Sequence, residues 1–130
     1  MTKRILIAED DAFLVKMYQL ELENAEWTIQ IANDGKKAIA AITKEQPDLL
    51  LLDLLMPDVD GFGVLKYIQE KGYKFPVIVL SNLSQDIDKE KCNALGARDY
   101  FVKSDMELDQ LAAMIEKYIE KDNGLLAMSL

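Results

Sequence analysis

Carboxylates follow two short apolar runs of the sequence. Asp53 comes directly after four consecutive leucines at 49–52, and three acids at 9–11 come directly after the apolar run 5–8. Apolar runs without alternation are typical of strands covered on both faces, as in a parallel sheet between two helical layers. In such sheets, ligands and chemistry gather beyond the carboxyl ends of the strands. If both strands lie in one sheet, these acids converge at one edge.

Metal binding is the chemistry that converging carboxylates could perform. Like charges a few ångströms apart repel one another unless a cation lies between them. Oxygen ligands without histidine or cysteine suit Mg2+, so Glu9, Asp10 and Asp53 are candidate ligands. Each acid also has a simpler interpretation, because Asp10 or Asp11 could cap the helix that follows, and Asp53 could cap its own loop.

Two later apolar runs deliver a hydroxyl group, Ser81, and an ammonium group, Lys103. These residues belong to an ordered set of motifs: Glu9-Asp10, Asp53 with Met56-Pro57 and Asp60-Gly61, Ser81, Gly96-Ala97, and Tyr100 three residues before Lys103. With this set, the chain resembles the receiver domain of two-component response regulators over residues 2–121, in its single-domain form. The resemblance implies that Asp53 accepts a phosphoryl group from a phosphohistidine on a histidine kinase or a histidine phosphotransfer protein.

The resemblance implies a role for each residue of the site. Mg2+ would bridge Asp10, Asp53 and a phosphoryl oxygen, with the backbone carbonyl of Leu55 as a further ligand. Glu9 would reach the ion directly or through water. Asp11 is the looser third acid, which a shift of one residue in the register would bring into the metal site. Lys103 and the Ser81 hydroxyl would hold the remaining phosphoryl oxygens.

Ser81 and Tyr100 are the expected switch residues. In the resembled family, the hydroxyl moves toward the phosphoryl group and frees space into which the aromatic side chain of the fifth strand turns. This movement would change the face formed by helix four, strand five and helix five, where we expect a downstream protein target to bind. The alternative is that Tyr100 is an ordinary half-buried strand residue.

Three residues depart from the common family pattern. Ser104 replaces the usual proline, which predicts a trans peptide bond after Lys103, Asn82 replaces a smaller residue, and Ser81 stands where threonine is common. The residues two positions after Asp53 and Ser81 are Leu55 and Leu83. If their side chains overhang the phosphoryl group, they offer an attacking water no hydrogen bond, which predicts slow hydrolysis. If they point to solvent, they leave the rate unchanged.

Strand-like and helix-like segments alternate along the chain. This pattern predicts an α/β fold with a doubly wound, five-stranded parallel sheet, a flavodoxin-like (βα)5 unit with strand order 2-1-3-4-5. The second strand is expected at 28–32, and the first four helices at 12–24, 36–45, 63–70 and 85–95. In the fourth helix, Ile87, Ala94 and Leu95 are expected to face inward. The last helix is expected to begin with a capping box at 104–107, to end at Gly124, and to bury Leu108, Leu111, Ala112, Ile115 and Ile119.

Length and composition restrict the class of protein. The 130 residues suit one domain, expected at 1–122 and followed by a short tail at 123–130 that is either frayed or docks on this domain or on a partner. The net charge of −8 disfavours nonspecific binding to nucleic acid or to anionic membrane. No signal peptide or membrane span is evident, so we expect a cytoplasmic protein without membrane insertion. The single cysteine, Cys92, excludes an intrachain disulfide.

The chain contains no histidine. This excludes a Ser-His-Asp triad and a histidine-ligated zinc site, and it requires any phosphohistidine donor to be another molecule. Because the chain ends soon after the expected fifth helix, its output is expected to be a protein contact.

Three other functions compete with a phosphorylated receiver. An aspartate-nucleophile phosphatase needs a second acid where Leu55 stands, and a flavodoxin-type carrier needs a phosphate loop where the acids 9–11 would repel phosphate. A receiver-like scaffold that binds its partner without phosphorylation shares every core residue, so only a measured phosphorylation separates it from a phosphorylated receiver.

Overall fold

The computed structural model describes residues 2–23 and 26–128, with side chains described as far as residue 119. In this part of the chain, five strands alternate with five α-helices, and one short 3-10 helix, η1, precedes the last helix. In chain order they are β1 (Lys3–Ala8), α1 (Ala12–Glu21), β2 (Trp27–Ala32), α2 (Gly35–Lys44), β3 (Leu49–Leu52), α3 (Gly61–Lys71), β4 (Val77–Ser81), α4 (Asp86–Ala94), β5 (Asp99–Val102), η1 (Lys103–Asp105) and α5 (Leu108–Met128).

The strands form one parallel sheet in the order β2-β1-β3-β4-β5, which confirms the predicted topology. The register decides which strand ends meet. Ala8, the last residue of β1, pairs with Leu52, the last residue of β3, and Ser81 pairs with Val102 at the ends of β4 and β5. The residues that follow these four strands therefore leave the sheet along one edge.

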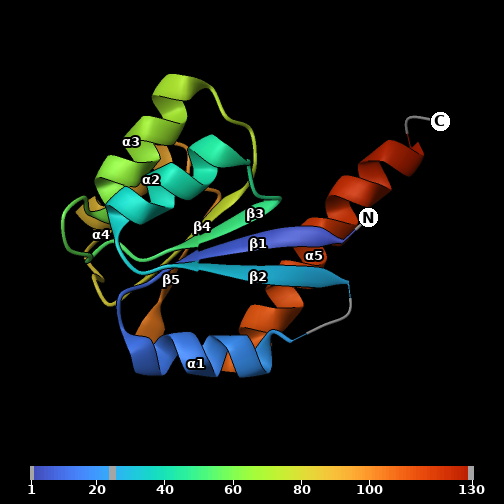
Figure 1. Ribbon diagram of the computed structural model, residues 1–130, viewed down its shortest axis with the longest axis horizontal. Helices are drawn as coiled ribbons and strands as arrows, with labels where there is room; N and C mark the ends of the chain where they lie inside the picture. The colour runs from blue at the N-terminus through green and yellow to red at the C-terminus, as the bar shows by residue number, and fades with distance from the viewer. Residues whose placement is uncertain (1, 24–25, 129–130) are drawn as a thin grey trace.

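Helices cover both faces of the sheet (Figure 1), with α2, α3 and α4 on one face and α1 and α5 on the other. The four leucines of β3 alternate between the two faces. Leu50 and Leu52 belong to the buried cluster under α2, α3 and α4, whereas Leu49 and Leu51 belong to the cluster under α1 and α5. Burying each leucine contributes about 1.5–3 kcal/mol. The absence of alternation in this run is thus explained by a strand covered on both sides.

Aspartate side chains define where three of the helices begin. Asp11 accepts hydrogen bonds from the backbone N–H groups of Phe13 and Leu14 at the start of α1. Asp34 caps α2 and Asp60 caps α3 in the same way. These contacts satisfy N–H groups that have no partner inside the helix. The Asp60-Gly61 pair of the sequence is therefore the start of a helix.

The fourth helix presents a different face from the one expected. Ile87 is 68% exposed and Ala94 is exposed as well, so the prediction that they face inward is wrong. Cys92 is fully buried instead, and Leu95 packs against the core as expected. At about 100° per residue, Ile87 lies about 140° around the helix from Cys92. A short polar helix with one buried side chain gives too weak a pattern to fix its rotation.

The start of the last helix also differs from the prediction. Ser104 does not cap α5, because residues Lys103–Asp105 form η1 and α5 begins at Leu108. The cap lies three residues later, where the backbone N–H of Glu107 donates to the side-chain carbonyl of Gln110 at 3.1 Å, which is half of a capping box. The expected apolar stripe is confirmed, with Leu111 and Ile115 buried and its other members packed against the same cluster.

The expected helix ends need two further corrections. The α5 helix continues to Met128 (Figure 1), past Gly124, because one glycine costs a helix only about 1 kcal/mol relative to alanine. The division of the chain at residue 122 stays a prediction, and residues 129–130 of the tail lie outside the described residues. The first helix ends at Glu21, and its expected last residue, Asn24, is not among those described.

No helix in the described ranges has the length and apolar character that crossing a membrane requires.

Candidate functional site

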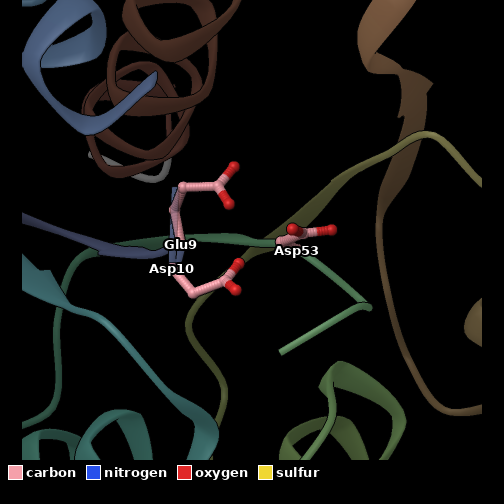
Figure 2. A group of neighbouring side chains, drawn as sticks. All are labelled: Glu9, Asp10 and Asp53. Atoms are coloured by element: carbon pink, nitrogen blue, oxygen red, sulfur yellow. The ribbon is translucent and has the colours of Figure 1, made fainter. Parts of the chain in front are cut away.

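The ends of β1 and β3 bring three carboxylates together. Glu9 and Asp10 follow β1, and Asp53 follows β3. The N–H of Asp53 donates to the carbonyl of Ala8 at 3.0 Å, so pairing between the strands continues to the site. One carboxylate oxygen from each acid lies within 4.8 Å of the others. Figure 2 shows Glu9 and Asp10 projecting toward the side on which Asp53 lies.

Lys103 enters this cluster from the end of β5. Its Nζ donates to Glu9 Oε1 and to Asp53 Oδ2, the latter at 3.0 Å. The side chains of Glu9 and Asp53 are almost fully buried and that of Lys103 is 12% exposed. One ammonium group therefore accompanies three carboxylates and contacts two of them directly. The excess negative charge favours binding of a cation.

Burial changes the proton affinity of Glu9 and Lys103. It raises the pKa of Glu9 to about 7, and the charge of Asp53 adds to this effect, while the hydrogen bond from Lys103 opposes it. Burial lowers the pKa of Lys103, but its hydrogen bonds to Glu9 and Asp53 outweigh burial and raise that pKa above its usual value. Lys103 is thus held in its charged form beside the carboxylates.

The donor set fits Mg2+. The cluster offers hard carboxylate oxygens, which this ion prefers, and Asp10 is exposed, so an ion can be reached from solvent. Asp11 is not a member of the cluster among the described residues. Its carboxylate caps α1, in agreement with the simpler interpretation, and its role as the looser third metal ligand stays a prediction.

Asp53 is oriented through both carboxylate oxygens. Lys103 contacts Oδ2, and the backbone N–H of Leu55 donates to Oδ1 at 3.3 Å. The Leu55 side chain is 54% exposed. Its backbone carbonyl stays a predicted metal ligand.

No peptide bond in the described part of the chain is cis, which confirms the trans bond predicted between Lys103 and Ser104.

Ser81 and Tyr100 are linked through the backbone of Leu83. Ser81 is fully buried at the end of β4, and its Oγ accepts from the N–H of Leu83 at 3.4 Å. The Tyr100 hydroxyl donates to the carbonyl of Leu83, and the ring packs against the cluster under α2, α3 and α4. The sequence analysis missed this use of Leu83, and no side-chain signal could have revealed it, because the link runs through backbone atoms.

Comparison with known proteins places the whole arrangement in one family. Residues 5–116 match the family model of the response regulator receiver domain. The chain belongs to this family. The resemblance to a receiver domain that was inferred from the motifs is therefore confirmed, and the single-domain form stays a prediction. Receiver domains act in two-component signalling, and phosphorylation and Mg2+ are typical of them.

Regulatory proteins of bacteria are among the relatives of this receiver domain. The alkaline phosphatase synthesis transcriptional regulatory protein PhoP of Bacillus subtilis is 34% identical over 103 residues, which are 79% of this chain and 43% of that protein. The regulatory protein VanRc of Enterococcus gallinarum is 37% identical over 112 residues, which are 86% of this chain and 48% of that protein. The receiver domain thus spans about half the length of these relatives.

Solved receiver structures share the fold. The receiver domain of the Francisella response regulator 1452 superposes with a TM-score of 0.86 at 26% identity, covering 93% of this chain and 99% of the other. The phosphorylated cyanobacterial phytochrome response regulator RcpA gives a TM-score of 0.77 at 30% identity and covers 90% of this chain and 91% of its own.

Proposed function

We propose that this receiver domain accepts a phosphoryl group on Asp53 from the phosphohistidine of a histidine kinase or histidine phosphotransfer protein, in a Mg2+-dependent reaction. The observation that carries the proposal is the contact of Lys103 with Asp53 inside the cluster formed with Glu9 and Asp10. The domain is a signalling protein that catalyses only its own phosphorylation and dephosphorylation. We place it in the cytoplasm.

Transfer to a carboxylate depends on alignment and charge neutralisation more than on proton transfer. An oxygen of Asp53 bonds to phosphorus while the bond from phosphorus to the donor nitrogen breaks, and the electron pair returns to the imidazole. Lys103 and the Ser81 hydroxyl then hold phosphoryl oxygens. Glu9, Asp10, Asp53 and the carbonyl of Leu55 would hold Mg2+, which supplies positive charge to the phosphoryl oxygens when it is bound.

Exposed apolar side chains support docking of the phosphodonor at this edge. Phe13 at the start of α1, Leu55 after β3 and Ile87 at the start of α4 are 70%, 54% and 68% exposed. All three lie where helices or loops leave the carboxyl ends of the strands. Covering such side chains with a partner removes apolar surface from water and stabilises the complex. These 130 residues contain no histidine and so cannot supply the phosphohistidine themselves.

The downstream target is expected on the face that contains α4, β5 and α5. A cavity of about 620 Å³ lies between β5 and α5 and is lined by Phe101, Val102, Met106, Met114 and Tyr118 among others. Methionine-lined grooves adapt readily to different partners. The net charge of −8 supports a protein target rather than nucleic acid. We propose that the domain acts as a stand-alone regulator through this contact.

Mass spectrometry tests the proposed function. Incubation with Mg2+ and a small acyl phosphate should add about 80 Da to the protein, and removal of Mg2+ with a chelator should prevent the addition. Absence of labelling under conditions that label another receiver would favour the alternative, a receiver-like scaffold that binds its partner without phosphorylation.

The Tyr100→Phe variant should weaken the switch without affecting phosphorylation. It removes the hydroxyl that holds the carbonyl of Leu83, and with it the link from Ser81 to β5. Backbone amide shifts in α4 on addition of a phosphoryl mimic should fall to less than about half of those in the wild type. Tyr67→Phe, which removes a hydroxyl that contacts Thr43 between α3 and α2, away from the proposed output face, is the control. Equal shifts in all three proteins would exclude Tyr100 from the switch.

The phosphorylated protein should decay slowly, and the Leu55→Asn/Leu83→Glu double variant should decay about ten-fold faster. Polar side chains there could orient an attacking water. Leu55 is largely exposed, whereas Leu83 packs against the core, so most of the gain should come from Leu55→Asn alone. Decay is followed by the loss of the 80 Da adduct with Mg2+ present. An unchanged decay rate in the double variant would show that these leucines do not control water access.

A further inference from the structure

The N-terminus of α2 lies against the loop that follows Asp53 with no room for a side chain. A Cβ atom on Gly35 would lie 1.8 Å from the carbonyl oxygen of Val59 and 2.6 Å from its carbonyl carbon. Both are backbone atoms, which cannot rotate away as a flexible side chain can. The positive-φ glycines of the described residues are Gly72 and Gly96. The need for glycine at position 35 is therefore a matter of contact and not of backbone conformation.

The same loop is held from its other side by the start of α3. A Cβ atom on Gly61 would lie 2.4 Å from the carbonyl oxygen of Asp53 and 2.6 Å from the Cα of Leu54. The N–H of Gly61 also donates to the carbonyl of Leu54 at 2.9 Å. The loop from Asp53 to Gly61 is thus confined between two helix starts, each of which approaches its backbone through a glycine.

A larger residue at position 35 should displace the loop rather than α2, because α2 is held more firmly than the loop. Asp34 caps the helix, and Ala38 and Ile42 anchor it with fully buried side chains. The loop is anchored at Leu54, which is fully buried, but beyond it Pro57 and Asp58 are exposed, and Asp58 has a left-handed φ of 67°. A non-glycine residue in that region adds strain. A methyl group at position 35 would therefore displace the loop.

We propose that Gly35 is a positioning residue for Asp53. Because Gly35 has no side chain, the carbonyl of Val59 can lie next to the start of α2. This contact fixes the loop in which the N–H of Leu55 orients the Asp53 carboxylate. Displacing the loop would disturb that orientation and the Leu55 carbonyl expected at the metal. The inference rests on the proposed phosphoryl-accepting function and adds α2 to the elements that control it.

The Gly35→Ala variant tests this role. We expect its Mg2+ dissociation constant to rise at least about ten-fold, as is common for residues that orient metal ligands indirectly, with a matching fall in the labelling rate by acyl phosphate. The backbone amide shifts of residues 53–60 should change in the metal-free protein. Ala40→Gly is the matched control, because it weakens α2 at an exposed position and should leave Mg2+ affinity within about two-fold.

The outcomes separate the inference from the proposed function. A folded Gly35→Ala protein with wild-type Mg2+ affinity and wild-type shifts at 53–60, or an equal loss of affinity in Ala40→Gly, overturns the positioning role. If the wild type binds no Mg2+ and takes up no phosphoryl group, the proposed function fails, and the metal-free shifts still decide whether Gly35 positions the loop.

A second variant keeps the test valid if Gly35→Ala does not fold. Gly35→Ala/Val59→Gly removes the Val59 side chain and gives the loop backbone room to move away from α2. Measured against Val59→Gly alone, the double variant should lose Mg2+ affinity further. Equal affinities in these two folded proteins would also overturn the role of Gly35.

Discussion

Asp53→Asn should abolish phosphoryl uptake and leave the fold intact. The amide has nearly the shape of the carboxylate but lacks the anionic oxygen that attacks phosphorus. Because Asp53 is almost fully buried beside two other acids, removing its charge also relieves repulsion in the metal-free protein. The substitution also removes the charge that pairs with Lys103, but Lys103 keeps its ion pair with Glu9, so the free energy of unfolding should stay within about 1 kcal/mol of the wild-type value. Mass spectrometry after incubation with Mg2+ and acyl phosphate, together with urea unfolding, checks both expectations.

Asp58→Asn is the matched control for this experiment. Asp58 lies in the same loop, is exposed, and has a positive φ that asparagine tolerates as well as aspartate does. This variant should take up the phosphoryl group at the wild-type rate. Labelling of Asp53→Asn at full rate would show that another residue accepts the phosphoryl group.

Asp10→Ala and Asp11→Ala should affect different properties: the first should weaken Mg2+ binding, and the second should lower the free energy of unfolding. Asp10 is in the carboxylate cluster, so its loss should weaken Mg2+ binding at least about ten-fold with little effect on stability. Asp11 caps α1 through two backbone N–H groups, so its loss should lower the free energy of unfolding by about 1 kcal/mol with little effect on Mg2+ affinity. Metal titration and urea unfolding measure the two quantities.

The paired design is its own control, because each variant removes one neighbouring aspartate and the two readouts are independent. Equal losses of Mg2+ affinity would place Asp11 at the metal and show that the register of the acidic pair is wrong by one residue. A loss of stability in Asp10→Ala that matched the loss in Asp11→Ala would show that both acids cap α1.

Short stretches of sequence determine some features of this protein. The run 49–52 predicts a strand covered on both faces because four leucines occur without alternation, and the sheet confirms it. Aspartates before the helices are effective caps because one residue supplies the oxygen and its neighbours supply the N–H groups. The order of acids, hydroxyl and lysine at strand ends, together with the spacing of Met56-Pro57, Asp60-Gly61, Gly96-Ala97 and Tyr100, was enough to predict the receiver family.

Local patterns failed where long-range contacts compete with them. The segment 104–107 resembles a capping box, yet Lys103 is drawn into the site by Glu9 and Asp53, and residues Lys103–Asp105 form η1 ahead of a later helix start. In α4, the rotation of the helix follows the burial of Cys92 against the core.

Tertiary structure alone decided how the site is assembled. Lys103 contacts Glu9 and Asp53, which lie 94 and 50 positions earlier in the chain. The Tyr100 hydroxyl contacts the backbone of Leu83, and Gly35 lies against the carbonyl of Val59. Sequence spacing sets the geometry of neighbours within a helix or strand, because the backbone repeats regularly there. Distances between separate elements depend on strand order, register and packing, and these arise only when the whole sheet has formed and both of its faces are covered.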